Sequence, residues 1–254
     1  MSKPQPNLLH MPRLIQEKIL DFSSTDSKLS LRATCKDFKH LVDSCRVNYD
    51  RLEMYWDCDD EYIRLVLANG NNIREIHFHG YSKGCYVKNV RKEEGKTVRG
   101  GDFIDLAMEH FLMILKYPKV HLEVFELGFQ IDYFQKTRFE RQKTQLIDKM
   151  TEILGTFNHK LNVNTFVMDI QQDAGDIAQI LPYLKPGTLR TLELSAQRPH
   201  SSSAEYKLFD LSSISHLDQW KRAEQLKTVW FHLDKEFAKR EMGHFKLCKY
   251  RVAQ

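Results

Sequence analysis

The sequence predicts an α/β protein, in which a helical N-terminal segment is followed by a solenoid of helices and parallel strands. Near the start, apolar residues recur at helical spacing, and further along an apolar motif that fits a short strand occurs five times. Helices and half-buried strands have different periods, about 3.6 and 2 residues, so the two kinds of segment can be told apart. Their regular alternation predicts a parallel sheet joined by crossover helices.

The N-terminal segment carries two apolar stripes. Ile15, Ile19 and Phe22 form the first stripe, and a second begins at Leu31 and continues through Phe38. Pro12 suits the first turn of the first helix, where its missing N–H would have had no partner. A unit of about forty residues is too small to bury a self-sufficient core. Part of its apolar surface must therefore be covered by the rest of the chain or by another protein.

Two stretches of this segment resemble an F-box. They are Asn7-Leu-Leu-His-Met-Pro-Arg-Leu-Ile-Gln-Glu-Lys-Ile-Leu and Leu31-Arg-Ala-Thr-Cys-Lys-Asp-Phe-Lys-His-Leu-Val. The resemblance implies a three-helix F-box over residues 1–50 that docks onto the Skp adaptor of a cullin-based ubiquitin ligase. The residues expected at this contact are Leu8, Leu9, Met11, Pro12, Ile15, Ile19, Leu20, Leu29, Leu31 and Cys35. The alternative is a helical cap on the next domain that binds no partner.

The strand motif consists of an apolar residue, two others, a second apolar residue, one other, and a third apolar residue. Its copies are Ile73, Ile76, Phe78; Leu122, Phe125, Leu127; Val163, Phe166, Met168; Leu189, Leu192, Leu194; and Leu226, Val229, Phe231, with a sixth candidate at Phe245, Cys248, Tyr250. We expect the middle residues Phe125, Phe166, Leu192 and Val229 to point inward. Recurrence favours a degenerate, leucine-rich-repeat-like solenoid over residues 51–254. A doubly wound domain with helices on both faces is the alternative.

A helical stripe precedes each of the five copies. The stripes are Tyr62, Leu65, Val66; Phe103, Leu106, Ala107, His110, Phe111, Ile114; Leu146, Ile147, Met150, Ile153, Leu154, Phe157; Ile177, Ile180, Leu181, Leu184; and Ile214, Leu217, Trp220. Turn residues then separate helix from strand, for example Asn69–Asn72 and Pro186-Gly187.

The second half of the chain resembles the FTH domain, which is found behind F-boxes in nematode proteins. The residues that carry the resemblance are 111–115, 120–127, 161–168 and most specifically Ile180-Leu-Pro-Tyr-Leu-Lys-Pro-Gly-Thr-Leu-Arg-Thr-Leu-Glu-Leu. It covers roughly residues 100–235. Together with the N-terminal match, it implies a nematode F-box protein of the FTH type (F-box A family). Such a protein is a substrate-recognition subunit, linked to a cullin through the adaptor, with a protein substrate of unknown identity.

Composition is that of an ordinary intracellular protein. The net charge of +4 on 254 residues does not demand a nucleic-acid surface. No apolar run is long enough to span a membrane and no leader follows Met1, so we expect a cytoplasmic and/or nuclear protein without membrane contact. The five cysteines are irregularly spaced, which is typical of reduced thiols.

The sequence gives little indication of catalysis. His77 and His79 would share the outward face of a strand, but no third metal ligand is evident. Asp169, Asp173 and Asp176 lack the register of a calcium loop, and no glycine-rich phosphate loop follows a strand. We therefore expect a non-catalytic protein with no metal and no cofactor.

Two charged segments, residues 82–101 and 132–143, are predicted to be loops inserted after strands. If they share one rim of the solenoid, they form a basic, aromatic-edged surface suited to an acidic peptide or to RNA. The residues proposed for this target-binding rim are Arg91, Lys92, Arg138, Phe139 and Arg141. Solvated loops are the alternative. For the whole chain, the alternative function is an RNA-associated or scaffolding protein with a vestigial F-box, in which the basic rim does the binding. RNA reached through a ribonucleoprotein target is a further candidate partner.

Overall fold

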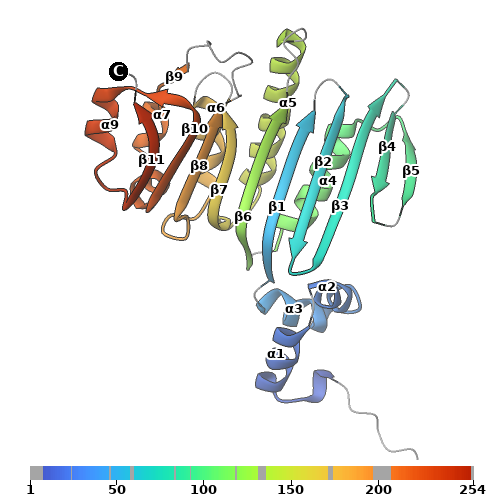
Figure 1. Cartoon of the computed structure of the whole chain (residues 1–254). Helices are drawn as coiled ribbons and strands as arrows, with labels where there is room; N and C mark the ends of the chain where they lie inside the picture. The colour runs from blue at the N-terminus through green and yellow to red at the C-terminus, as the bar shows by residue number, and fades with distance from the viewer. Residues whose placement is uncertain are drawn as a thin grey trace, which may run out of the picture.

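The computed structural model describes residues 8–23, 25–45, 47–57, 60–82, 84–91, 93–117, 119–130, 136–170, 174–196 and 207–252. In these residues a small group of helices hangs from one end of a large sheet, and further helices lie behind that sheet (Figure 1). The predicted α/β class is confirmed.

The N-terminal helices have a core of their own. They are the 3-10 turn η1 (Leu8–His10) and the helices α1 (Arg13–Phe22), α2 (Thr25–Arg32) and α3 (Lys36–Ser44). Leu20, Leu41, Val42 and Cys45 are buried against one another, and Leu31 and Phe38 pack around them. This cluster is separate from the core behind the sheet.

The sheet has eleven strands in the order β11-β10-β8-β7-β6-β1-β2-β3-β4-β5, with β9 paired to β10 off this path. The strands are β1 (Val47–Asp57), β2 (Tyr62–Asn69), β3 (Asn72–Tyr81), β4 (Gly84–Asn89), β5 (Glu94–Arg99), β6 (Val120–Gln130), β7 (Asn162–Ile170), β8 (Thr191–Ala196), β9 (Lys207–Phe209), β10 (Gln225–Leu233) and β11 (Leu247–Val252). The helical elements after the first strand are α4 (Phe103–Leu115), α5 (Lys136–Gly155), α6 (Gly175–Ile180), η3 (Leu181–Tyr183), α7 (Ser212–Ser215), α8 (Asp218–Arg222) and α9 (Lys235–Glu241).

The half of the sheet from β1 through β6 to β11 is parallel, as predicted. Phe125 in β6 and Phe166 in β7 are register partners with ring centroids 5.5 Å apart, and Phe111 from α4 lies 5.9 Å from Phe125. Leu192 continues this buried row in β8. The helices expected before the second to fifth strand motifs are present as α4, α5, α6 with η3, and α7 with α8.

The other half of the sheet corrects the prediction, because β1 to β5 form an antiparallel meander. The segment around Tyr62 was expected to be a helix but is β2. In it Ile63, Leu65 and Leu67 are buried on alternate positions, which is the period of a strand. Gly70, in the left-handed region with φ 56°, closes the tight turn from β2 into β3. The first strand motif, Ile73 to Phe78, therefore lies in an antiparallel hairpin.

The two predicted loops are also regular structure. Residues 84–99 form the hairpin β4–β5, and α5 begins at Lys136. Lys143, at the end of the second predicted loop, is buried and pairs with Asp176 at 2.8 Å and Glu140 at 3.3 Å. The prediction of two loops is wrong, because both segments contain many charged residues and their apolar periodicity is weak.

The inward position expected for Val229 is wrong, since its side chain is 37% exposed. Leu226 lies inward before it and Phe231 after it. On a regular strand, residues that share a face are an even number of positions apart. Leu226 and Phe231 are an odd number apart, so the alternation of inward and outward side chains shifts between them. The pairing of β10 with β11 shifts in the same stretch, between Lys227 and His232. An irregularity of this kind re-aims the side chains of a strand.

In Figure 1 the helices α4, α5 and α6 lie behind the sheet, and none of the described helices crosses the front of strands β1 to β8. This is not the two-sided arrangement of a doubly wound domain. None of the described helices is long and apolar enough to cross a membrane. Cys35, Cys45, Cys85 and Cys248 are free thiols.

Candidate functional site

Helix α1 exposes an apolar patch, defined here as Leu14, Ile15 and Ile19. Their exposed fractions are 64%, 42% and 39%. Ile15 and Ile19 are four positions apart, so their side chains lie together on one face of the helix. Leu14 borders this face, one position before Ile15. Exposed apolar side chains gathered in one place are typical of interaction surfaces, so this patch is the candidate site.

Local bonds fix the chain that leads into this patch. The Pro12 carbonyl accepts hydrogen bonds from the Ile15 and Gln16 amides, which starts α1. The Gln16 side-chain amide donates to the carbonyls of Leu9 and Met11, at 3.0 and 2.9 Å. The segment Leu8–Pro12 is thereby held against the first turn of the helix, beside the patch.

The structure divides the residues predicted for the adaptor contact. Pro12, Ile15, Ile19 and Cys35 are exposed, and Leu8, Leu9, Met11 and Leu31 are half-buried. Leu20 is fully buried in the helical core and supports the patch from below. Leu29 lies in α2, but its side chain is outside the described residues. Leu14 was missed, because it falls one position off the stripe from which the prediction was made.

An aromatic and ionic joint connects the helices to the sheet. The Arg32 guanidinium donates to Asp43 at 2.6 and 3.3 Å and lies 4.4 Å from the centroid of the Tyr117 ring. Tyr117 follows α4 and packs against the sheet core. The bond with Asp43, despite partial burial, raises the pKa of Arg32. One cation thus contacts both parts of the chain.

We expect Tyr117→Ala to loosen this joint, because a cation–π contact of about 0.5–2 kcal/mol is lost. Tyr117→Phe keeps the ring and is the matched control. Small-angle X-ray scattering should show a larger maximum dimension for the alanine variant only. Identical scattering of the two variants would mean that the joint does not set the orientation of the helices.

The front face of the sheet carries an ion-pair cluster where the two halves of the sheet meet. Glu53 in β1 is only 9% exposed and pairs with Arg64 in β2 and with Arg51, the latter at 3.3 Å. Arg51 also pairs with Glu126 in β6. Burial raises the pKa of Glu126, and Arg51 opposes that rise. The cluster links three strands across the boundary between the meander and the parallel half.

The upper ends of the parallel strands carry a second polar group. Asp169 in β7 accepts hydrogen bonds from the Ser195 hydroxyl and from the Phe129 amide, the latter at 3.3 Å. Burial raises the pKa of Asp169, and the two hydrogen bonds offset only part of this rise. The Tyr55 hydroxyl bonds Gln130, and burial raises the pKa of Tyr55 to about 12, so this hydroxyl stays protonated at neutral pH.

An aromatic row crosses the meander on the same face. His77 and His79 do share the outward face of β3, as predicted, because Phe78 between them is fully buried. His79 stacks on Tyr62 at 5.0 Å, and His77 contacts Glu75 at 2.8 Å. Burial and the neighbouring His77 lower the pKa of His79. No group of three metal-binding side chains occurs in the part of the chain that the structure describes.

Of the five residues proposed for a single basic rim, the two whose side chains the structure describes, Arg91 and Arg141, lie apart. Arg91 lies in the turn at the lower ends of β4 and β5, where it reaches the Asn71 carbonyl at 3.5 Å. Arg141 is exposed on α5, which starts above the upper ends of the strands (Figure 1). Arg138 and Phe139 belong to the same helix, but their side chains are outside the described residues, as is all of Lys92.

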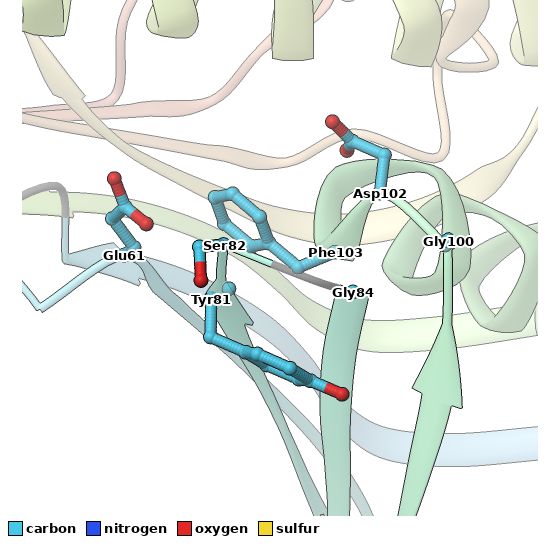
Figure 2. A pocket seen from close by; sticks show the side chains of 9 residues that line it. Glu61, Tyr81, Ser82, Gly84, Gly100, Asp102 and Phe103 are labelled. Atoms are coloured by element: carbon cyan, nitrogen blue, oxygen red, sulfur yellow. The ribbon is translucent and has the colours of Figure 1, made fainter.

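A pocket of about 440 Å³ opens at the upper ends of β3, β4 and β5 (Figure 2). Its lining includes Glu61, Tyr81, Asp102 and Phe103. Asp102 caps α4 by accepting hydrogen bonds from two backbone amides of the first turn, at 2.7 and 3.2 Å. At Gly84 a Cβ atom would lie 2.1 Å from a backbone oxygen, so the hairpin needs glycine there. The pocket is thus bounded by a helix cap and a close backbone approach.

Comparison with known families confirms both resemblances. Residues 8–50 match the F-box domain and residues 144–254 match the FTH domain. F-box A protein 224 of Caenorhabditis elegans is 26% identical over 196 residues. That match covers 75% of this chain and 48% of the relative, so the chain spans about half the length of the curated relative. No solved structure matches the chain.

Proposed function

We propose that this chain, a nematode-type F-box protein with an FTH domain, is the substrate-recognition subunit of a Skp/cullin/F-box ubiquitin ligase. Its N-terminal helices bind the Skp-type adaptor, and through it a cullin. Its sheet domain binds a protein substrate. In this role the chain holds the substrate close to the ubiquitin-charged enzyme and carries out no chemical step itself. Proximity alone can accelerate a reaction between two bound partners.

The observation that carries this proposal is the exposed apolar patch of α1, which lies inside the F-box match. A helix that presents apolar anchors at i and i+4 fits a hydrophobic groove on another protein. The patch belongs to helices with their own small core, so a partner can cover it without disturbing the sheet.

We assign residues 1–50 to the adaptor-binding domain and residues 51–254 to the substrate-binding domain. The proposed adaptor contact consists of the predicted set together with Leu14, with Leu20 in a supporting role. The connection is short, because β1 begins at Val47. The RNA alternative relied on a single basic rim, and Arg91 and Arg141 lie at opposite ends of the sheet, so we retain only the adaptor proposal.

Reconstitution tests the proposal. With the adaptor, a cullin–RING module, a ubiquitin-charged E2 enzyme and ATP-dependent recharging, the chain is expected to be ubiquitinated in cis. The paired change Pro12→Ala with Ile15→Ala should abolish this modification and leave the thermal unfolding of the sheet domain unchanged. Equal modification of the wild type and the variant would contradict the proposal.

A further inference from the structure

Strand β5 is an edge of the sheet formed by the described strands. It is the last strand of the sheet order, and it pairs with β4 from Glu94 to Arg99 without a register shift. Alternate backbone N–H and C=O groups of an edge strand point away from the sheet, where an additional strand can pair with them. At the opposite edge the pairing of β11 with β10 is interrupted by a register shift. β5 is therefore the more regular template of the two.

The β5 edge is basic. Lys96 and Arg99 are exposed on the strand itself, and Arg91 is exposed in the turn before it. No ion pair joins Lys96 or Arg99 to another residue of the described ranges. Glu93 in the turn and Glu94 at the start of β5 offset two of these three positive charges. An approaching segment with acidic side chains would complement the edge.

Gly95 has no side chain, which leaves room for a neighbouring tyrosine on the front side of this edge. It faces Lys88 across the β4–β5 pair, and the Tyr86 hydroxyl occupies the place of its missing side chain, 1.9 Å from where a Cβ atom would lie. Tyr86 is 37% exposed. A strand added beside β5 would meet this phenol at the position of Gly95, and tyrosine is a common anchor of protein interfaces.

We propose that β5 docks an extended, acidic segment of the protein substrate, which adds to the sheet as a further antiparallel or parallel strand. The proposal rests on the proposed function for the identity of the partner as a substrate. A polypeptide is favoured because only a peptide backbone offers the alternating donors and acceptors that a strand edge pairs with. The acidic character follows from Lys96, Arg99 and Arg91.

Two synthetic peptides of equal length test the proposal on the full chain. One alternates glutamate with valine and the other alternates lysine with valine, and fluorescence anisotropy measures their binding. We expect the glutamate peptide to bind and the lysine peptide to bind at least about tenfold more weakly. The pair Lys96→Glu and Arg99→Glu should reverse this preference. The matched pair Lys221→Glu and Lys235→Glu, at exposed positions of α8 and α9, should leave it unchanged.

N-methylation separates strand addition from attraction between charges. A glutamate peptide methylated on every backbone nitrogen keeps its charge but loses the donors along both of its edges. This peptide should not bind measurably, because a strand without N–H donors cannot pair with β5. Hydrogen exchange of the β5 amides should slow in the wild-type complex.

Equal binding of the methylated and unmethylated glutamate peptides would overturn the proposal and leave a simple charged patch. Absence of binding by the glutamate peptide would also overturn it, and the basic side chains would then serve only to protect the edge from aggregation. Adaptor binding is measured on the same samples. If it persists while the peptides fail, only this inference is lost, whereas loss of adaptor binding in the wild type contradicts the proposed function.

Discussion

Phe125→Ala is expected to lower the free energy of unfolding of the sheet domain by about 3–5 kcal/mol, the range for emptying a buried phenylalanine site. Phe125 is fully buried at the centre of the sheet. Its ring lies between Phe111 from α4 and Phe166 from β7, at centroid distances of 5.9 and 5.5 Å. Truncation removes contacts on both sides, and two large rings cannot collapse into the space without moving a helix or a strand.

Urea denaturation followed by tryptophan fluorescence measures this loss. Val229→Ala is the matched control, because Val229 is an apolar residue of the same sheet but is 37% exposed. We expect the control to lose less than about 1 kcal/mol, the usual range for an exposed site. Similar losses for both variants would contradict the assignment of an inward face to Phe125 and an outward position to Val229.

Ile15→Asp combined with Ile19→Asp is expected to weaken adaptor binding roughly a thousandfold. Central apolar anchors of an interface contribute about 2 kcal/mol or more each, and every 1.4 kcal/mol corresponds to about a factor of ten. A carboxylate placed in an apolar groove adds the cost of losing its water. Biolayer interferometry with immobilised adaptor gives the two dissociation constants.

The matched control for this pair is Met113→Asp combined with Leu208→Asp. Met113 on α4 is 46% exposed and Leu208 on β9 is 54% exposed, so the change places the same two charges on exposed apolar positions outside the F-box match. Its dissociation constant should equal that of the wild type. If the control weakens binding as much as the pair does, the effect is one of net charge, and α1 does not carry the contact.

The parallel half of the fold could be predicted from the sequence because its signals are strong and local. Phe125 and Phe166 sit in runs whose alternation is visible, and the helices before them have wide apolar stripes. The antiparallel meander could not be predicted in the same way. Tyr62, Leu65 and Val66 satisfy helical spacing by coincidence, whereas the buried residues of β2 alternate from Ile63 to Leu67.

The sequence predicted the exposed face of α1 better than it predicted the basic rim. The exposed face of α1 follows from residues next to one another in sequence, so Ile15 and Ile19 could be identified. The basic rim required two distant segments to meet, and strand pairing places Arg91 away from Arg141. Contacts such as that between Arg32 and Tyr117 depend on the packing of separate elements, so no local sequence pattern predicts them.

The central claim is that the N-terminal helices bind a Skp-type adaptor as a self-contained surface. Isothermal titration calorimetry of the purified full chain with the purified adaptor, repeated at several temperatures, tests it most directly. We predict a one-to-one complex whose binding heat becomes more exothermic on warming, because burial of apolar surface gives a negative heat-capacity change. A titration without saturable heat at any temperature, on a chain whose circular dichroism shows it folded, would contradict the claim.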